Sequence, residues 1–308
     1  MSVPGHAAGT APPDAGTTGW RRLRATMARS ASTLLLPLAQ RVARDRIGGQ
    51  TVDDALLVAR RLADEGMACT LGFWDTPDCT HRQVADIHLE AVERLAALRP
   101  EGYVSIKPPA LGFDAGLADA LAQAAARNGV RLHADSHGPE TAEPACAMIE
   151  AMAGRHRGLS LGTTLPGRWS RSLADGDRAI GRGLAVRVVK GQWPDPTDPR
   201  RDPAAGFLDV VDRLAGRARH VAVASHDLEV VAAAVGRLRA AGTSCEIELI
   251  HAVPMAPVLR WARANAVAVR IYIPFGKGFM PNIVGLLRRD PALAWRIVRG
   301  LAVGDRGA

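Results

Sequence analysis

From residue 68 onwards, short apolar or β-branched segments recur about every thirty residues, separated by stretches with helical periodicity. The intervening stretches, such as LADALAQAAARNG and LEVVAAAVGRLRAAG, are rich in Ala, Leu and Arg and end on glycine, as helices commonly do. Strands that alternate with helices form parallel sheets, and eight such units favour a closed (β/α)8 barrel. The eight segments cover residues 68–74, 103–107, 130–135, 158–164, 185–191, 220–226, 245–251 and 268–275.

The competing fold is an open, doubly wound parallel sheet. Such sheets commonly carry a GxGxxG turn after their first strand, and no such turn follows the segment at 68–74. A length of 308 residues suits one α/β barrel with extensions, and an apolar content of 47% is enough to fill its core. We therefore predict an α/β protein, a TIM-like (β/α)8 barrel with N-terminal flanking helices.

The barrel is predicted to span residues 67–302, with extensions at both ends. Residues 1–19, MSVPGHAAGTAPPDAGTTG, contain almost no large apolar side chain and are predicted to form a disordered tail. Residues 20–66 are predicted to form N-terminal helices, of which TVDDALLVARRLADEG is the last. Within this region LLLPLA resembles a signal-peptide core, but it is short and basic residues resume at Arg41, which favours an amphipathic helix. Residues 303–308 are predicted to be a second tail.

The chain is strongly basic, with a net charge of +8 and a pI near 10.1. Its arginines are scattered singly and in pairs rather than gathered in a tract, so no specific nucleic-acid partner is predicted. Four cysteines without a CxxC pair argue against a disulfide framework or a zinc cluster, and favour a cytoplasmic location. No apolar stretch is long enough to span a membrane, and peripheral contact with a membrane surface is left open.

Polar side chains gather at the carboxyl ends of the predicted strands, where the active sites of such barrels lie. Because arginine predominates so strongly in this chain, the lysines retained at these ends indicate a need for a compact ammonium group. Gly276-Lys277-Gly278 has the ingredients of a phosphate-binding turn, although glycine-rich turns also follow strands for steric reasons. The residues at the strand ends are Trp74, Asp75, Lys107, His133, Asp135, Thr163, Thr164, Lys190, His226, His251 and Lys277.

The histidines among these residues raise a second interpretation. His133, Asp135 and His137 alternate along one segment, and His226 and His251 end two later ones, a donor set that could ligate zinc. Metal-dependent hydrolases built on barrels usually carry a histidine pair on the first strand, and LGFWD has none. We predict no metal site, and keep two alternatives: a metal-dependent hydrolase or isomerase, and a non-catalytic basic barrel that only binds.

Four strand-end motifs occur in order along the chain: VSIKPPALG (104–112), AVRVVKGQW (185–193), ASHD (224–227) and RIYIPFG (270–276). They resemble, in the same order, the Ser-x-Lys, Arg-x-Val-Lys-Gly, Ala-Thr-His-Asn/Asp and Arg-Val-Tyr-Val-Pro-Tyr-Gly segments of flavin-dependent proline dehydrogenases. The helical stretch at 51–66 resembles the helix that leads into the barrel of that family. Each motif is short, but their common order makes the combined resemblance fairly specific.

The resemblance implies FAD bound at the barrel mouth and hydride transfer from the substrate to flavin N5, with reoxidation by a quinone or another acceptor. Lys107 would meet the substrate carboxylate and Tyr272 would pack on the substrate ring. His133 falls on a family aspartate position, and Asp135 on the acidic position that follows. The cofactor would be contacted by Thr163 or Thr164, Arg187, Val189, Lys190, Gly191, Trp193 and His226.

Two further positions depart from the family pattern. Glu246-Ile247-Glu248 stands where the family has Glu-Phe-Gln on the seventh strand. The family also grips the proline carboxylate with two adjacent arginines after the eighth strand. A gapless alignment places these on Gly285 and Leu286, whereas a longer loop places them on Arg288 and Arg289, which is the register we predict.

The predicted function is therefore that of a flavoprotein, a proline dehydrogenase-like oxidoreductase of proline metabolism. It would oxidise proline or a related cyclic or secondary amine to the imine. Its expected partners are the small amine substrate, FAD, and a quinone or other electron acceptor.

Overall fold

The computed structural model describes residues 48–98, 102–251 and 253–279. Within these ranges, eight parallel strands close into a barrel in which each strand pairs with the next and β8 pairs with β1. The predicted (β/α)8 barrel is thereby confirmed. The strands are β1 (Ala68–Phe73), β2 (Gly102–Ile106), β3 (Arg131–Ala134), β4 (Leu161–Pro166), β5 (Ala185–Val189), β6 (Val221–Ala224), β7 (Cys245–Ile250) and β8 (Val269–Phe275).

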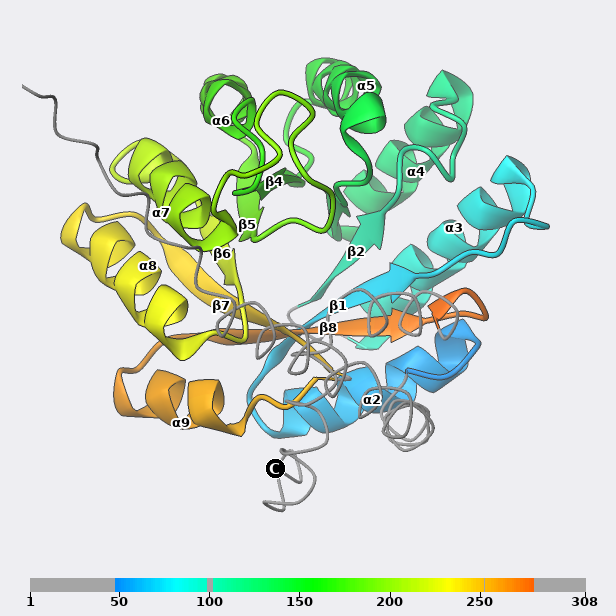
Figure 1. The fold of residues 1–308 in the computed structure, drawn as a ribbon. Coiled ribbons are helices and arrows are strands. Elements are labelled where there is room, and N and C mark those ends of the chain that lie inside the picture. The colour runs from blue at the N-terminus through cyan, green and yellow to red at the C-terminus, as the bar shows by residue number, and fades with distance from the viewer. Residues whose placement is uncertain (1–47, 99–101, 252, 280–308) are drawn as a thin grey trace, which may run out of the picture.

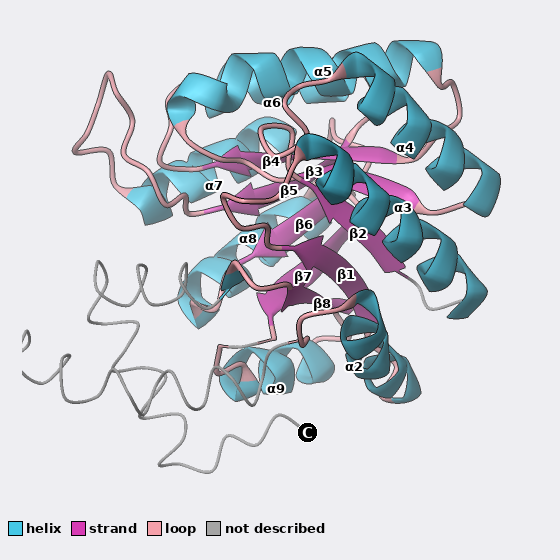
Figure 2. Ribbon diagram, turned by 90° about the vertical axis from the view of Figure 1, so that its right-hand side faces the viewer, coloured by secondary structure: helices cyan, strands magenta, loops and turns pink. Residues whose placement is uncertain are grey.

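Helices surround the barrel on its outside, as the two ribbon views show (Figures 1 and 2). The stretch predicted as the last N-terminal helix is α2, which packs against both β1 and β8 and so takes a place in the outer ring. The helices are α2 (Val52–Asp64), α3 (His81–Leu98), α4 (Ala115–Asn128), α5 (Ala142–Arg155), α6 (Ser172–Gly181), α7 (Pro203–Leu214), α8 (Leu228–Ala240) and α9 (Ala256–Ala264), with a short 3-10 turn at Pro139–Thr141.

Side-chain caps fix where several helices begin. Thr51 and Asp54 form a capping box at the start of α2, in which each side chain bonds the other's backbone N–H. Asp202 caps α7, and Pro203 occupies its first turn, where a missing N–H costs nothing. Asp227 caps α8 and thus anchors the loop that leaves β6.

The strand boundaries differ from the predicted ones by a few residues. The fourth segment was expected from residue 158, but β4 begins at Leu161, because Gly158 has a φ of 94° and belongs to the turn after α5. Lys107, Asp135 and Lys190 lie immediately beyond the ends of β2, β3 and β5. They therefore stand on the loops at the carboxyl end of the barrel.

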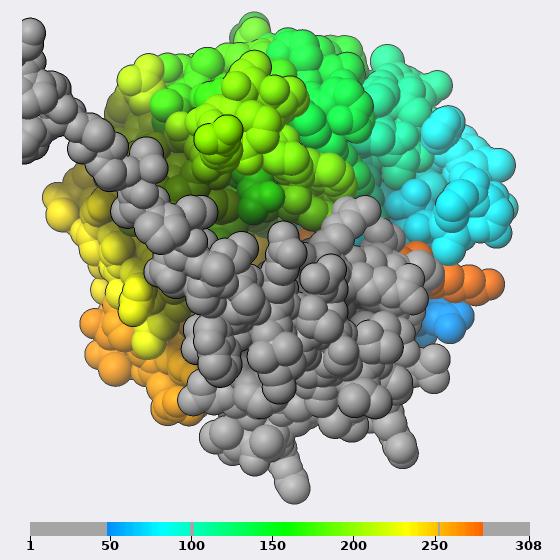
Figure 3. Space-filling model, in the orientation of Figure 1, coloured from blue at the N-terminus to red at the C-terminus, as the bar shows by residue number. Residues whose placement is uncertain are grey.

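The apolar core lies between the sheet and the helices. Outward-facing strand residues such as Leu71, Leu132 and Val188 are fully buried there. On the face shown in Figure 3, the described side chains form a rim that runs from cyan through green to yellow and orange. The strand residues that alternate with these apolar ones point into the barrel instead.

The inside of the barrel is strongly polar, whereas branched apolar residues usually fill it. Arg270 and Glu246 form an ion pair in which Nε and Oε1 are 2.8 Å apart, and both side chains are buried. The Arg270 guanidinium also lies 4.4 Å from the centre of the Tyr103 ring, a cation–π contact. Buried charges are tolerated only when they are paired and hydrogen-bonded, so this interior must be completed by specific partners.

Some sequence predictions lie outside the described residues. These are the tails at 1–19 and 303–308, residues 20–47 of the N-terminal helical region, and the part of the barrel domain after residue 279. No helix in the ranges that the structure covers is long and apolar enough to cross a membrane.

Candidate active site

Arg187 on β5 stands at the centre of the polar interior, with 4% of its surface exposed. Its Nε and Nη2 donate to the two carboxylate oxygens of Glu248 on β7, both at 2.8 Å. Its Nη1 donates to Asp135 Oδ1 at 2.5 Å. Two carboxylates from different strands therefore fix the position of this guanidinium, and the first of them does so through a bidentate pair.

Glu248 receives a full set of hydrogen bonds. Besides the two from Arg187, its carboxylate accepts one from Thr70 at 2.9 Å and one from the Tyr103 hydroxyl at 2.8 Å. Each carboxylate oxygen accepts from two of these donors, so a glutamine would place its NH₂ group against two of them and could not accept all four. Glu248 thus supplies the carboxylate that neutralises Arg187.

Asp135 links this buried pair to the mouth of the barrel. Its Oδ1 accepts from Ser105 at 2.6 Å and its Oδ2 accepts from the Tyr272 hydroxyl at 2.9 Å. Burial is the largest single influence and works to raise the pKa of Asp135, but the Arg187 guanidinium, the Ser105 and Tyr272 hydroxyls and Lys107 together lower it. The carboxylate is therefore ionised at neutral pH and holds Tyr272 in place.

The predicted residues of β3 and β4 divide between the two faces of the sheet. His133 is buried inside, 5.4 Å from the Tyr103 ring centre, with Nε2 3.2 Å from Thr164 Oγ1. Thr164 Oγ1 also lies 3.4 Å from Arg187 Nη1. Because successive strand residues point to opposite faces, Thr163 faces away from this interior, so of the two predicted threonines only Thr164 points inward.

Asp135, and not His133, makes the carboxylate contacts to Arg187 and Tyr272. The resemblance had assigned the family aspartate position to His133, which has no carboxylate. Burial and the positive charge of Arg187 lower the pKa of His133 well below its usual value, so its ring is neutral. A neutral ring suits a place among several arginines.

Lys107 and its neighbours form the part of the mouth nearest β1. Lys107 Nζ lies 3.2 Å from Asp75 Oδ1 and 4.5 Å from the centre of the Trp74 ring. Its side chain is only 7% exposed. Burial lowers the pKa of Lys107, while Asp75 and Asp135 act in the opposite direction. This is a compact, largely desolvated ammonium group, as the sequence suggested.

The ends of β4, β5 and β6 carry a second group of cations. Lys190 Nζ donates to Asp227 at 2.7 Å, and about a third of each side chain is exposed. Gly191 follows with a φ of 92°, and a Cβ there would lie 2.9 Å from Pro166 Cβ and 3.2 Å from Arg168 Cβ. Val189 is one pleat period from Arg187, so it faces the same side of β5.

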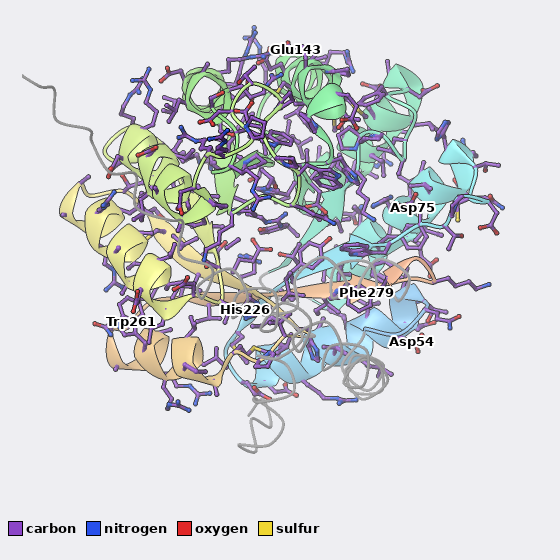
Figure 4. The ribbon with its side chains drawn as sticks, in the orientation of Figure 1. Asp54, Asp75, Glu143, His226, Trp261 and Phe279 are labelled. Atoms are coloured by element: carbon purple, nitrogen blue, oxygen red, sulfur yellow. The ribbon has the colours of Figure 1, made fainter. Side chains whose placement is uncertain are left out.

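His226 and Trp193 border this group. His226 Nε2 accepts from the Ile250 N–H at 2.9 Å, and its Nδ1 is 3.1 Å from the Pro254 carbonyl. Both ring nitrogens thus bond backbone at and after the end of β7. The Trp193 ring centre lies 6.2 Å from that of His137. Figure 4 shows Asp75 and His226 at separate points of the rim.

The Gly276-Lys277-Gly278 turn packs against β1, and its glycine N–H groups bond backbone carbonyls. The Gly276 N–H donates to the Gly49 carbonyl and the Gly278 N–H to the Trp74 carbonyl, both at 3.0 Å. A Cβ at Gly278 would lie 1.9 Å from the Asp75 carbonyl oxygen. The glycines are therefore needed for close packing, the steric explanation, rather than for a phosphate.

Four buried polar atoms in and around the site have no hydrogen-bond partner among the described residues: His133 Nδ1 inside the barrel, and Trp74 Nε1, His137 Nε2 and Arg168 Nε near the strand ends. Buried polar groups are normally hydrogen-bonded, so unpartnered ones at a barrel mouth suit a bound ligand. Arg168 and Lys190, next to the bare backbone of Gly191, form a donor set that fits an anionic group such as the pyrophosphate of FAD.

The histidines do not come together as the metal alternative requires. In the part of the chain that the structure describes, no three His, Cys, Asp or Glu side chains are grouped so as to hold a metal ion. His133 points into the barrel, whereas His226 bonds the backbone at and after the end of β7.

The site thus contains predicted and unpredicted residues. His133, Asp135, Thr164, Arg187 and Tyr272 come together in one cluster of contacts, and Lys107 pairs with Asp75 beside it. Lys190, Gly191, Trp193 and His226 lie on the adjoining loops. Arg288 and Arg289, with the alternative Gly285 and Leu286, lie outside the described residues. The site members that were not predicted are Tyr103, Ser105, Arg168 and Glu248; the first two alternate with Lys107 along β2, and this period-two spacing could have found them.

Comparison with known proteins gives similarity of fold only. No protein-family model matches the chain, and neither does any curated protein sequence. Among solved structures, proline utilization A from Bdellovibrio bacteriovorus, inactivated by N-propargylglycine, aligns with a TM-score of 0.70 and 17% identity. The alignment covers 80% of this chain and 32% of that one.

Two further structures agree. A mutant of proline utilization A from Bradyrhizobium japonicum aligns with a TM-score of 0.68 and 18% identity, over 82% of this chain and 31% of that one. Proline utilization A from Corynebacterium freiburgense aligns with a TM-score of 0.66 and 18% identity, and the alignment covers 89% of this chain and 34% of that one. The chain thus spans about a third of the length of each of these proteins. It shares the fold of a part of proline utilization A.

Proposed function

We propose that this chain is a flavin-dependent oxidoreductase of the proline dehydrogenase type, which oxidises proline or a related cyclic secondary amine to the imine. The observation that carries the proposal is the polar cluster that reaches from the barrel interior to the mouth. Arg187, Asp135 and Tyr272 belong to strands that bear the family-like motifs or pair with them, and hydrogen bonds connect them. Lys107 pairs with Asp75 at the same mouth, and the charge of Asp135 acts on it. The shared fold with proline utilization A supports it.

The cofactor would lie over the ends of β4, β5 and β6. Lys190 and Arg168 would hold its phosphates, Gly191 would let the backbone approach closely, and Thr164, Val189, Trp193 and His226 would complete the surroundings. Bound FAD would supply the acceptor for a hydride, which carries the electron pair. A quinone or another acceptor would then take up the electrons.

The residues of the chain would bind and orient the amine. From the neutral amine, the C–H next to nitrogen leaves as hydride while the nitrogen lone pair forms the C=N bond, and the iminium ion then releases its N–H proton to water to give the imine. The ring must be held in one orientation for the hydride to leave. Tyr272, fixed by Asp135, offers a ring face for this purpose. Lys107, which follows β2 on the other side of β1, offers a buried ammonium for a polar substituent.

We expect Lys190→Met to weaken FAD affinity about tenfold, because a charge-assisted contact to the pyrophosphate is lost. The measurement is a fluorescence titration of the purified apoprotein with FAD. Lys277→Met is the matched control, because Lys277 is exposed on the turn that follows β8 and hydrogen-bonds the backbone after β1. The dissociation constant of this variant for FAD should equal that of the wild type. Equal FAD affinity of all three proteins would remove Lys190 from the cofactor site.

A further inference from the structure

The ammonium group of Lys107 already has an anionic partner within the chain. Its Nζ lies 3.2 Å from Asp75 Oδ1, and the two side chains are 7% and 30% exposed. Asp75 follows the end of β1 and Lys107 the end of β2, so the pair spans two neighbouring strands at the mouth. A substrate group that approaches Lys107 therefore meets an ion pair rather than an isolated cation.

The backbone that carries Asp75 is held in this place. The turn after β8 packs on the backbone of Trp74 and Asp75, with the Gly278 N–H donating to the Trp74 carbonyl at 3.0 Å. The Trp74 N–H donates in turn to the Phe275 carbonyl at 2.8 Å. The Phe279 ring lies edge-on to the Trp74 ring at 5.6 Å. Figure 4 shows Asp75 and Phe279 on the same, right-hand side of the barrel.

A free carboxylate at Lys107 would lie close to the Asp75 carboxylate. Like charges a few ångströms apart in a partly desolvated site repel strongly, and a single ammonium must then be shared between them. The Asp135 carboxylate adds to the negative charge around Lys107. An uncharged carbonyl or an unsubstituted ring carbon would meet no such repulsion.

The surroundings of the pair suit a neutral polar substituent. Trp74 Nε1 is buried, donates to no group in the described part of the chain, and belongs to the ring over which Lys107 lies. An indole N–H is a donor only, so it is complemented by an uncharged carbonyl oxygen without adding a charge.

We propose that Asp75 determines substrate specificity by selecting cyclic secondary amines whose carboxyl group is absent or masked as an amide or ester, over the free amino acid. The inference rests on the proposed function and narrows it. Lys107 and Trp74 then bind the masked carbonyl, and Asp75 keeps the ammonium charge balanced.

The test compares L-proline with L-prolinamide, which share a ring and differ in the charge of the substituent. Dissociation constants are measured by calorimetric titration of the full chain supplemented with FAD, for the wild type, Asp75→Asn and Asp78→Asn. Wild type should bind prolinamide more tightly than proline. Asp75→Asn should tighten proline binding about tenfold and change prolinamide binding by less than about twofold. Asp78 lies in the same loop and is exposed, so its variant should match the wild type.

The inference is overturned if Asp75→Asn changes both affinities by the same factor, if Asp78→Asn has the same effect, or if neither ligand binds any of the three proteins. Its failure is distinguishable from that of the proposed function. Suppose that the wild type and the Asp75→Asn variant both bind FAD, and that proline reduces the flavin equally well in both. The proposed oxidoreductase function then stands, and the specificity role of Asp75 fails. If the protein binds no FAD, the proposed function is wrong, while the difference between the affinities for proline and prolinamide still tests the role of Asp75.

Discussion

Replacing Arg187 with methionine is expected to lower the free energy of unfolding by about 3–5 kcal/mol. The guanidinium is buried and pairs with Glu248 through two hydrogen bonds of 2.8 Å and with Asp135 through one of 2.5 Å. Methionine fills a similar volume but leaves both carboxylates without their cation. An uncompensated buried charge costs far more than the pair itself contributes, so the loss should be large.

The measurement is urea-induced unfolding followed by circular dichroism. The control is Arg213→Met, which breaks the ion pair with Asp177 on the surface, where 49% of the arginine and 34% of the aspartate side chain are exposed. That variant should lose less than about 1 kcal/mol. The double variant Arg187→Met/Glu248→Met should recover part of the loss of the single variant. Losses of the same size for Arg187→Met and Arg213→Met would show that Arg187 does not anchor the interior.

Gly72→Ala is expected to reduce kcat/KM toward the amine substrate about a hundredfold, because small displacements of a positioning group have effects of that size. Gly72 on β1 lies against the Tyr272 side chain, and an added Cβ would stand 2.0 Å from its hydroxyl oxygen. The tyrosine must then leave its hydrogen bond with Asp135. The atoms nearest to the added methyl group all belong to Tyr272, and the substitution adds no charge.

Gly176→Ala is the matched control, because an added Cβ there meets its nearest atoms at 3.6 Å, an ordinary contact. It should leave kcat/KM unchanged. Thermal unfolding of both variants separates a local displacement from a general loss of fold. If Gly72→Ala keeps wild-type kinetics, Tyr272 has no role in orienting the substrate.

The barrel could be predicted because its signals are local. Each strand is a short apolar segment, and several helices end on a glycine or begin at a capping residue such as Asp202. Eight repeats of a strand followed by a helix are compatible with only a few sheet topologies. The start of β4 was missed because Gly158 and Leu159 read as part of an apolar segment, whereas the turn after α5 uses Gly158 for its positive φ. Such boundaries depend on one residue's dihedral angle, which the pattern does not show.

The sequence predicted that the site lies at the strand ends, but it did not predict which side chains pair with one another there. Asp135, Arg187 and Glu248 come from the end of β3, from β5 and from β7, and only closure of the barrel brings their side chains to one point. Which of Thr163 and Thr164 faces inward could not be decided from the sequence, because an error of one residue in strand register exchanges the two faces. Arg168 was missed because it stands beyond the predicted strand, in a turn.

The polar interior has a consequence for function. A barrel filled with charges is organised by ion pairs that fix Arg187, Asp135 and Tyr272 before any ligand binds, which is the preorganisation that an active site requires. Asp135 stands just beyond the end of β3, so this set reaches from the barrel interior to the strand ends, where the active sites of such barrels lie.

The most direct test of the proposed oxidoreductase is the visible spectrum of the purified protein with FAD, recorded without oxygen before and after addition of proline, prolinamide or pyrrolidine. The predicted result is a flavin absorption band that is bleached by at least one of these amines. Protein that binds no FAD, or a bound flavin that stays oxidised with every one of them, would contradict the proposal.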